Sequence, residues 1–171
     1  MPIVPQIDYA TAPEDTKRAY DEHLKKHGRV TNMKRTLLHS VPAFNAYMEW
    51  YTLAAEIETF IGRRGLFIFS WAISSENDCL ICTMFFRKLL KDSGDNPDKL
   101  ALDPHEQLLV DFGRAITKDA HAISDGIYAR LKKSFTDPEI LQLTAFAGLM
   151  VATNLINTVL KVDLDDYLQG Y

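Results

Sequence analysis

Helix-start signals recur along this 171-residue sequence and constrain its fold more than any other feature. They combine a capping residue with an early proline or acidic residue, at Thr11-Ala-Pro13, Asp103-Pro104, Ser124-Asp125 and Thr136-Asp-Pro138. Capping side chains accept hydrogen bonds from the free amides of a first helical turn, and proline suits its backbone geometry. No segment alternates polar and apolar residues with the period of a half-buried strand. The sequence therefore predicts an all-α fold.

Apolar residues at three- and four-residue intervals predict where the helices lie. We expect helices at about residues 13–28, 33–39, 43–60, 66–74, 78–91, 104–117, 125–133 and 138–160. A turn at Gly62 and Gly65 should separate the third helix from the fourth, which is apolar nearly all round and should be buried. Residues 1–12 should form an extended N-terminal arm, and residues 92–103 an internal loop. We expect residues 1–171 to form one domain.

Composition narrows the possible functions. Hydrophobic residues make up 47% of the chain and charged residues 25%, with a net charge of −4. Nucleic-acid binding needs a basic face, which this balance does not favour. The first residues lack the basic and apolar regions of a secretory signal, and no apolar run reaches the roughly 20 residues of a membrane span. We therefore expect a cytoplasmic protein with neither a nucleic-acid nor a membrane partner.

The two cysteines, Cys79 and Cys82, lie three residues apart behind a cap-rich break, with Asn77 or Asp78 as the expected N-cap. A disulfide between them would close almost no loop and would stabilise little. Side chains at i and i+3 share a helix face, and the first-turn amides stabilise a thiolate. Glu76 and Asp78 oppose this effect. The spacing favours redox chemistry.

Other interpretations of the cysteines are a zinc site and a pair of inert core thiols. A structural zinc site needs four ligands, and this motif supplies two. His23 and His27 lie on a charged helix, where a solvated face is the simpler interpretation. The acidic cluster Asp163, Asp165 and Asp166 lacks the pattern of a calcium loop and should be a solvated helix end. We expect no metal and no cofactor.

Several blocks of sequence resemble the carboxymuconolactone decarboxylase/alkylhydroperoxidase D-like family, over roughly residues 35 to 168. They are Phe67–Cys82, Leu109–Thr117, Ser124–Tyr128, Phe135–Ile140 and Asn154–Asn157. The resemblance implies an all-α bundle of helical hairpins that assembles into dimers, trimers or hexamers. It also implies that Cys82 attacks a peroxide and Cys79 resolves the product. A dithiol partner, such as a lipoyl or thioredoxin-like protein, would then reduce the disulfide.

The sequence departs from the family at the proton relay. The peroxidase pattern has a glutamate and a histidine where this chain has Phe67 and Phe86. An aromatic ring cannot move a proton. Possible replacements are Glu76, which is close in sequence, and the more distant residues Glu49, Glu58 and His39. The two phenylalanines should line an apolar pocket or belong to the core.

The resemblance and the dithiol together predict a thiol-dependent peroxidase that reduces hydroperoxides in antioxidant defence, or exchanges disulfides. A second possibility is a non-catalytic oligomeric binding or redox-sensing protein that has lost the relay. A third is an enzyme like the carboxymuconolactone decarboxylases. The sequence shows no clear basic and histidine-containing pocket for a carboxylated lactone, which makes this third possibility the weakest.

Overall fold

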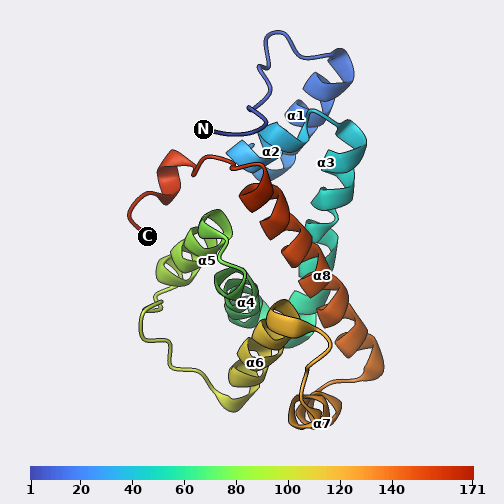
Figure 1. Cartoon of the computed structure of the whole chain (residues 1–171), viewed down its shortest axis with the longest axis vertical. Coiled ribbons are helices and arrows are strands. Elements are labelled where there is room, and N and C mark those ends of the chain that lie inside the picture. Colours follow the sequence, from blue (N-terminus) through green and yellow to red (C-terminus); the bar gives the residue numbers. More distant parts are fainter.

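The computed structural model describes residues 1–171 and consists of α-helices with one short 3₁₀ helix and no strands (Figure 1). The all-α prediction is confirmed. The helices are α1 Glu14–His27, α2 Asn32–Leu37, α3 Val41–Met48, α4 Trp50–Glu76, α5 Leu80–Asp92, α6 Pro104–Asp119, α7 Asp125–Ser134, α8 Asp137–Val159 and the 3₁₀ helix η1 Asp166–Leu168.

Helix α4 lies at the centre of the bundle and packs against α5, α6 and α8. Its segment from Leu66 to Ser74 is buried on nearly every side, as its uniform apolarity predicts. Phe69 stacks with Phe112 of α6 and Phe146 of α8. The main core of 21 buried residues therefore joins three helices around α4.

Gly62 forms a kink in α4 where two helical stretches meet, so the predicted break is confirmed there, although no loop separates the two stretches. Its backbone adopts φ 71° and ψ 166°, a conformation that residues with a Cβ atom rarely tolerate. Gly65 lies within the helix, where an added Cβ would come within 3.3 Å of Leu109 Cδ1. The predicted helix at 43–60 is also divided, because α3 ends at Met48 and α4 begins at Trp50.

The N-terminal residues and α1 to α3 gather at the end of the bundle where α8 terminates (Figure 1). The amide of Ile3 donates to the Leu160 carbonyl at 2.8 Å, and that of Ile7 to the Arg35 carbonyl at 3.1 Å. The first helix begins at Glu14 with Pro13 at its cap position, so Thr11 is not the cap. Gly28 ends this helix in the left-handed conformation, as predicted.

The three later start signals cap helices as expected. Asp103 and Thr136 form capping boxes with Glu106 and Glu139, and Ser124 accepts a hydrogen bond from the Ile127 amide. Helix α8 is long and apolar enough to cross a membrane by length and composition alone. The core helix of a soluble protein meets the same criterion, and α8 packs one side against α4, with 33% of its most apolar 18-residue window buried.

Candidate functional site

The two cysteines lie at the junction of α4 and α5. Helix α4 ends at Glu76, and Asp78 turns the chain with a positive φ of 51°. Cys79 is itself the N-cap of α5, and Cys82 lies in the first turn. This shifts the predicted helix start by one residue. Both cysteines are free thiols and buried, with exposed fractions of 1% for Cys79 and 7% for Cys82.

Asn157 of α8 connects the dithiol to the opposite helix. Its Nδ2 atom donates to Cys82 Sγ at 3.3 Å and to Cys79 Sγ at 3.7 Å. The side chain is buried, and its Oδ1 atom has no hydrogen-bond partner. Asn157 sits near the end of a largely apolar helix, in a block that resembles the family. A polar amide such as Asn157 within an apolar helix is visible in the sequence, but this position alone does not predict contact with the dithiol.

The two thiols share a proton unequally. The pKa of Cys79 is lowered to about 7, chiefly because the Cys82 thiol donates a hydrogen bond to its sulfur; the backbone amide of Cys82 and the Asn157 amide add to this and burial opposes it. The pKa of Cys82 is raised well above its ordinary value by the same hydrogen bond and by burial. Above about pH 7 the pair therefore carries one negative charge, centred on Cys79, and one proton, held by Cys82.

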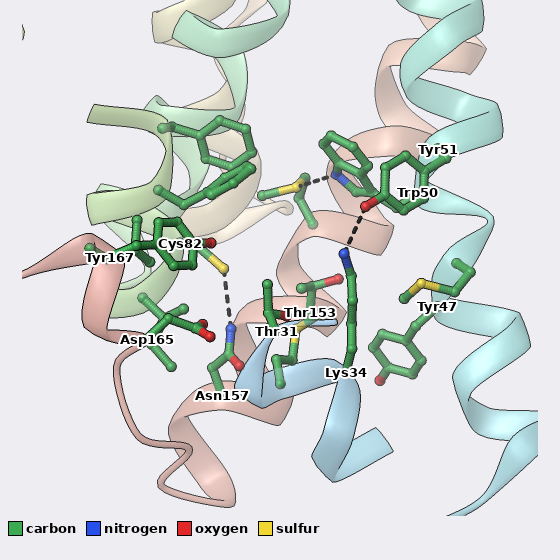
Figure 2. A pocket seen from close by; sticks show the side chains of 17 residues that line it. Thr31, Lys34, Tyr47, Trp50, Tyr51, Cys82, Thr153, Asn157, Asp165 and Tyr167 are labelled. Atoms are coloured by element: carbon green, nitrogen blue, oxygen red, sulfur yellow. Dashed lines mark hydrogen bonds between the residues drawn. The ribbon is translucent and has the colours of Figure 1, made fainter. Parts of the chain in front are cut away.

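A cavity of about 130 Å³ opens beside Cys82 and is lined mainly by hydrophobic residues. Trp50 and Tyr51 of α4, Phe85 and Phe86 of α5 and Met150 of α8 form much of its wall. Figure 2 shows Cys82 entering from one side and Asn157 beneath it. Cys79 does not line the cavity. A ligand in the cavity would therefore meet Cys82, while the more acidic sulfur lies behind it.

The cavity also has polar groups on its wall. Lys34 of α2 donates a 2.7 Å hydrogen bond to the Tyr51 hydroxyl (Figure 2). Burial lowers the pKa of Lys34 to about 8 and raises that of Tyr51 to about 12. Asp165 and Tyr167, from the C-terminal segment, complete this part of the wall. None of these four residues was predicted, because the segments that carry them are distant in sequence from the dithiol.

The four predicted replacements for the proton relay all lie outside the cavity. The carboxylate of Glu76 lies 4.0 Å from Arg114, on the surface. Glu49 and Glu58 are exposed. The Nε2 atom of exposed His39 lies 2.9 Å from the Pro5 carbonyl oxygen. The structure therefore brings Cys79 and Cys82 together but does not bring any of these four side chains to the cavity with them.

The two phenylalanines at the relay positions differ in their surroundings. Phe86 lines the cavity, and its ring centroid lies 6.3 Å from that of Trp50. Phe67 is buried in the main core and contributes nothing to the cavity. Both residues therefore belong to the main core, as one expectation has it, and Phe86 also fulfils the other by lining the cavity.

Two predictions of solvated surface fail at one residue each, while Asp163 and Asp166 of the acidic cluster are exposed as predicted. His23 is buried, and burial lowers its pKa to about 4, because its helix packs that face against Phe44 and Tyr51. Asp165 is also buried, where it accepts a 3.0 Å hydrogen bond from the Asn32 amide. A C-terminal segment that folds back over α2 explains this burial, and nothing in the local sequence indicates it.

Three solved structures share this arrangement of helices. An uncharacterized peroxidase-related protein from Silicibacter sp. TM1040 is 19% identical, with a TM-score of 0.75, and the match covers 98% of this chain and 95% of that one. A second, from Ralstonia eutropha JMP134 and described as an alkylhydroperoxidase AhpD core, is 20% identical, with a TM-score of 0.70 and coverages of 96% and 92%. The debrominase Bmp8 is 14% identical, with a TM-score of 0.74 and coverages of 97% and 94%.

No protein-family model and no curated protein matches the sequence. At identities of 20% and below, the structural likeness shows the fold. This chain has the alkylhydroperoxidase D-like fold, as the sequence blocks predict. The fold is shared by peroxidase-related proteins and by a debrominase, so one scaffold carries more than one chemistry.

Proposed function

We propose that this protein is a thiol-dependent oxidoreductase that reduces hydroperoxides with the Cys79–Cys82 dithiol. The proposal rests on one observation: the two sulfurs differ both in acidity and in access to the cavity. Cys82 faces a cavity of about 130 Å³, while Cys79 is the more acidic thiol and lies outside it. One sulfur can therefore meet the substrate while the other holds and returns a proton.

The first step needs a base, and the Cys79 thiolate is that base. It accepts the proton of Cys82, whose thiolate then attacks the terminal oxygen of the hydroperoxide. A sulfur–oxygen bond forms as the oxygen–oxygen bond breaks. The departing alkoxide takes the proton from Cys79 and leaves as an alcohol, so Cys79 is a thiolate again and Cys82 is a sulfenic acid.

The second step closes the disulfide. The Cys79 thiolate attacks the sulfenic sulfur of Cys82, and hydroxide leaves and takes a proton from solvent. The dithiol has lost two electrons, and the hydroperoxide has become an alcohol and water. An external dithiol, such as a lipoyl or thioredoxin-like protein, then reduces the disulfide by thiol–disulfide exchange. A reducing compartment such as the cytoplasm supplies this donor, and the role is antioxidant defence.

This scheme explains how the protein can work with Phe67 and Phe86 at the relay positions. A positioned general base typically contributes about 10²–10⁴-fold to a rate. Here the base is covalently fixed three residues from the nucleophile, at the cap of the same helix. Asn157 donates to both sulfurs and so favours the anion whichever sulfur carries it.

Steady-state reduction of cumene hydroperoxide with dihydrolipoamide tests the proposal. Wild type should turn over, and Cys82→Ser should show only background consumption. Cys79→Ser should turn over slowly, because it lacks the base and must rely on the donor dithiol to resolve the Cys82 sulfenic acid. Thr117→Ser, at a half-buried position outside the cavity, is the matched control and should behave as wild type.

The debrominase neighbour and the aromatic cavity wall favour a second candidate, reductive dehalogenation. The Cys82 thiolate would attack the halogen of an aryl bromide, and the aryl carbanion would take the proton from Cys79. Attack by Cys79 on the sulfenyl bromide would then give the disulfide and bromide. Bromide release from a bromophenol, at a rate that exceeds peroxide reduction, would favour this reaction over the first.

The same assays distinguish a peroxidase from a non-catalytic protein and from a decarboxylase-like enzyme. A non-catalytic binding or redox-sensing protein would form the disulfide with peroxide but would not turn over with any dithiol donor. A decarboxylase-like enzyme would keep its activity on a lactone acid in the Cys82→Ser variant. If both thiols stay free after treatment with excess peroxide, the dithiol is inert and the peroxidase proposal is wrong.

A further inference from the structure

Lys34 is a cation on the wall of a largely apolar cavity and forms no ion pair there. Its Nζ atom makes one hydrogen bond, to the Tyr51 hydroxyl, and no carboxylate oxygen lies within 4.0 Å. A half-buried ammonium group beside aromatic walls loses hydration that one neutral hydroxyl does not restore. Burial lowers its pKa to about 8, which reflects the same cost. An anion in the cavity would compensate for that loss.

Two charged side chains, Lys34 and Asp165, line the cavity. Asp165 is the acidic side chain on the wall, and its carboxylate already accepts the Asn32 amide. Arg29 and Arg35 also act on Asp165, in addition to Lys34. Asp165 therefore interacts with two cations outside the cavity as well as with Lys34, which leaves Lys34 available to pair with a ligand that has one negative charge.

The cavity volume limits the size of the ligand. A dry engineered cavity of about 150 Å³ lined by apolar side chains accepts benzene. The Cys82 cavity is similar, at about 130 Å³, and Trp50, Phe85 and Phe86 supply flat apolar walls. The space suits one aromatic ring or an aliphatic group of that size.

We propose that Lys34 and Tyr51 bind the carboxylate of a small aryl acid whose ring occupies the cavity beside Cys82. Lys34 and Tyr51 meet on one side of the cavity and Cys82 enters from another (Figure 2). A ring held by its carboxylate would thus direct a distal substituent towards the sulfur. The assignment of that substituent as a hydroperoxide rests on the proposed function, whereas binding of the acid does not.

Tyr51 adds selectivity for an acceptor group. When Lys34 donates to its oxygen, the phenolic hydrogen is free to donate to a ligand. The pKa of this phenol is raised to about 12, so the donor persists at neutral pH. Two donors on one side of the cavity match the two oxygens of a carboxylate.

Binding of benzoate to the reduced protein tests the inference, with benzyl alcohol as the neutral ligand of similar shape. Trp50 lines the cavity, so its fluorescence should report occupancy in a Trp71→Phe background that leaves one indole. Benzoate should bind at least about tenfold more tightly than benzyl alcohol, as one charge-assisted hydrogen bond implies. Equal affinities for the two ligands would overturn the inference.

Variants of the two donors, Lys34 and Tyr51, provide a second test of benzoate binding. Lys34→Met should weaken benzoate at least about tenfold and leave benzyl alcohol within about twofold, and Tyr51→Phe should weaken benzoate by a smaller factor. Lys25→Met, on the exposed face of α1, is the control and should change neither affinity. If Lys34→Met does not fold, Tyr51→Phe tests the carboxylate site on its own. Undiminished binding of benzoate to Tyr51→Phe would contradict the proposed role of these two donors.

The double variant Cys79→Ser/Cys82→Ser separates this inference from the proposed function. It cannot reduce a peroxide, yet it keeps Lys34, Tyr51 and the cavity wall and should still bind benzoate. Benzoate binding without peroxide turnover in wild type would contradict the proposed function alone. Turnover without selective benzoate binding would contradict the inference alone.

Discussion

At the scale of single residues, the chemistry depends on which sulfur carries the charge. The hydrogen bond from Cys82 and the amide of Asn157 favour a thiolate on Cys79, with a pKa of about 7. The hydrogen bond between the thiols, together with burial, keeps the proton on Cys82. The nucleophile that meets the cavity and the group with the low pKa are therefore different atoms of one coupled pair.

The first prediction concerns the number of thiolates. The absorbance of the folded, reduced protein near 240 nm should rise by one thiolate through a midpoint of about pH 7 and stay level to about pH 9. In denaturant both thiols should titrate together near their ordinary pKa of about 8.5. Two thiolates in the folded protein at pH 9 would contradict the shared proton.

The same pair makes stability depend on pH, and the sign follows from proton counts. Between about pH 7 and about pH 8.5 the folded protein has lost the Cys79 proton, while the unfolded chain keeps most of both protons because its thiols titrate near 8.5. The unfolded state binds more protons, so this pair makes the free energy of unfolding rise with pH in that window. Above it, the unfolded chain loses the Cys82 proton first, and the contribution falls. Comparison with Cys79→Ser in urea melts isolates this part.

The second prediction removes the amide that contacts both sulfurs. Asn157→Leu keeps the approximate volume but deletes the donor, so the pKa of Cys79 should rise and iodoacetamide should react more slowly at pH 7. Asn154→Leu is the control, because Asn154 is equally buried but accepts from Ser74 and contacts neither cysteine. An unchanged alkylation rate in Asn157→Leu would show that its hydrogen bonds do not stabilise the anion.

At the scale of elements, α4 shows where sequence reasoning succeeded and where it failed. Its apolar run at Leu66–Ser74 correctly predicted a buried central helix. Of the two glycines in the predicted turn, Gly62 interrupts the helix as predicted, whereas Gly65 lies inside it and leaves room for Leu109. The sequence alone does not distinguish these two roles, because the role of Gly65 depends on which helix packs against it.

The third prediction follows from the bend. Gly62 has φ 71° with open space around it, so an added Cβ would meet no neighbour and the cost would be backbone strain alone. Gly62→Ala should lower the free energy of unfolding by about 1–3 kcal/mol, measured by urea denaturation. Gly126→Ala, in the first turn of α7 with only a 3.8 Å contact to Ser124 Oγ, should instead be neutral or slightly stabilising. Equal effects would contradict a strained backbone at Gly62.

The fourth prediction concerns the anchoring of the internal loop at 92–103. Arg64 of α4 bonds both carboxylate oxygens of Asp95, the Ala101 carbonyl and the Glu106 carboxylate. Arg64→Met should speed tryptic cleavage after Lys99 severalfold, since the loop loses its link to the bundle. Arg63→Met, one residue away, leaves these bonds intact and serves as control. An unchanged cleavage rate in Arg64→Met would show that the loop at 92–103 stays ordered without the Arg64 hydrogen bonds.

At the scale of the whole molecule, the site joins parts that are remote in the sequence. The dithiol was predictable because its two residues and its cap are local. The cavity was not, because Lys34, Tyr51 and Asp165 come from three separate segments. The fold-back of the C-terminal segment over α2, which buries Asp165, depends on tertiary packing that no periodicity reveals.

The outer face of α8 bears on the expected homo-oligomer. Leu141, Gly148, Leu155 and Val159 follow one another at intervals of seven, seven and four residues, and so share one side of the helix. The three larger residues are 68%, 52% and 63% exposed. An added Cβ at Gly148 would meet nothing within 4 Å, so another backbone can approach closely there. Exposed apolar faces of this kind are typical of protein–protein contacts.

The last prediction is that copies of this chain associate through that face. Light scattering on a sizing column should give an oligomer for wild type, and Leu155→Glu should shift it towards the monomer, because a buried unpaired carboxylate is costly. Leu24→Glu, at a 41% exposed position on α1, is the matched control and should keep the wild-type mass. The cavity lies on the opposite side of α8 from this face, through Met150, Thr153 and Asn157. A monomeric Leu155→Glu that still binds benzoate would therefore show that assembly and ligand binding are separate, whereas a monomeric wild type would contradict the assembly.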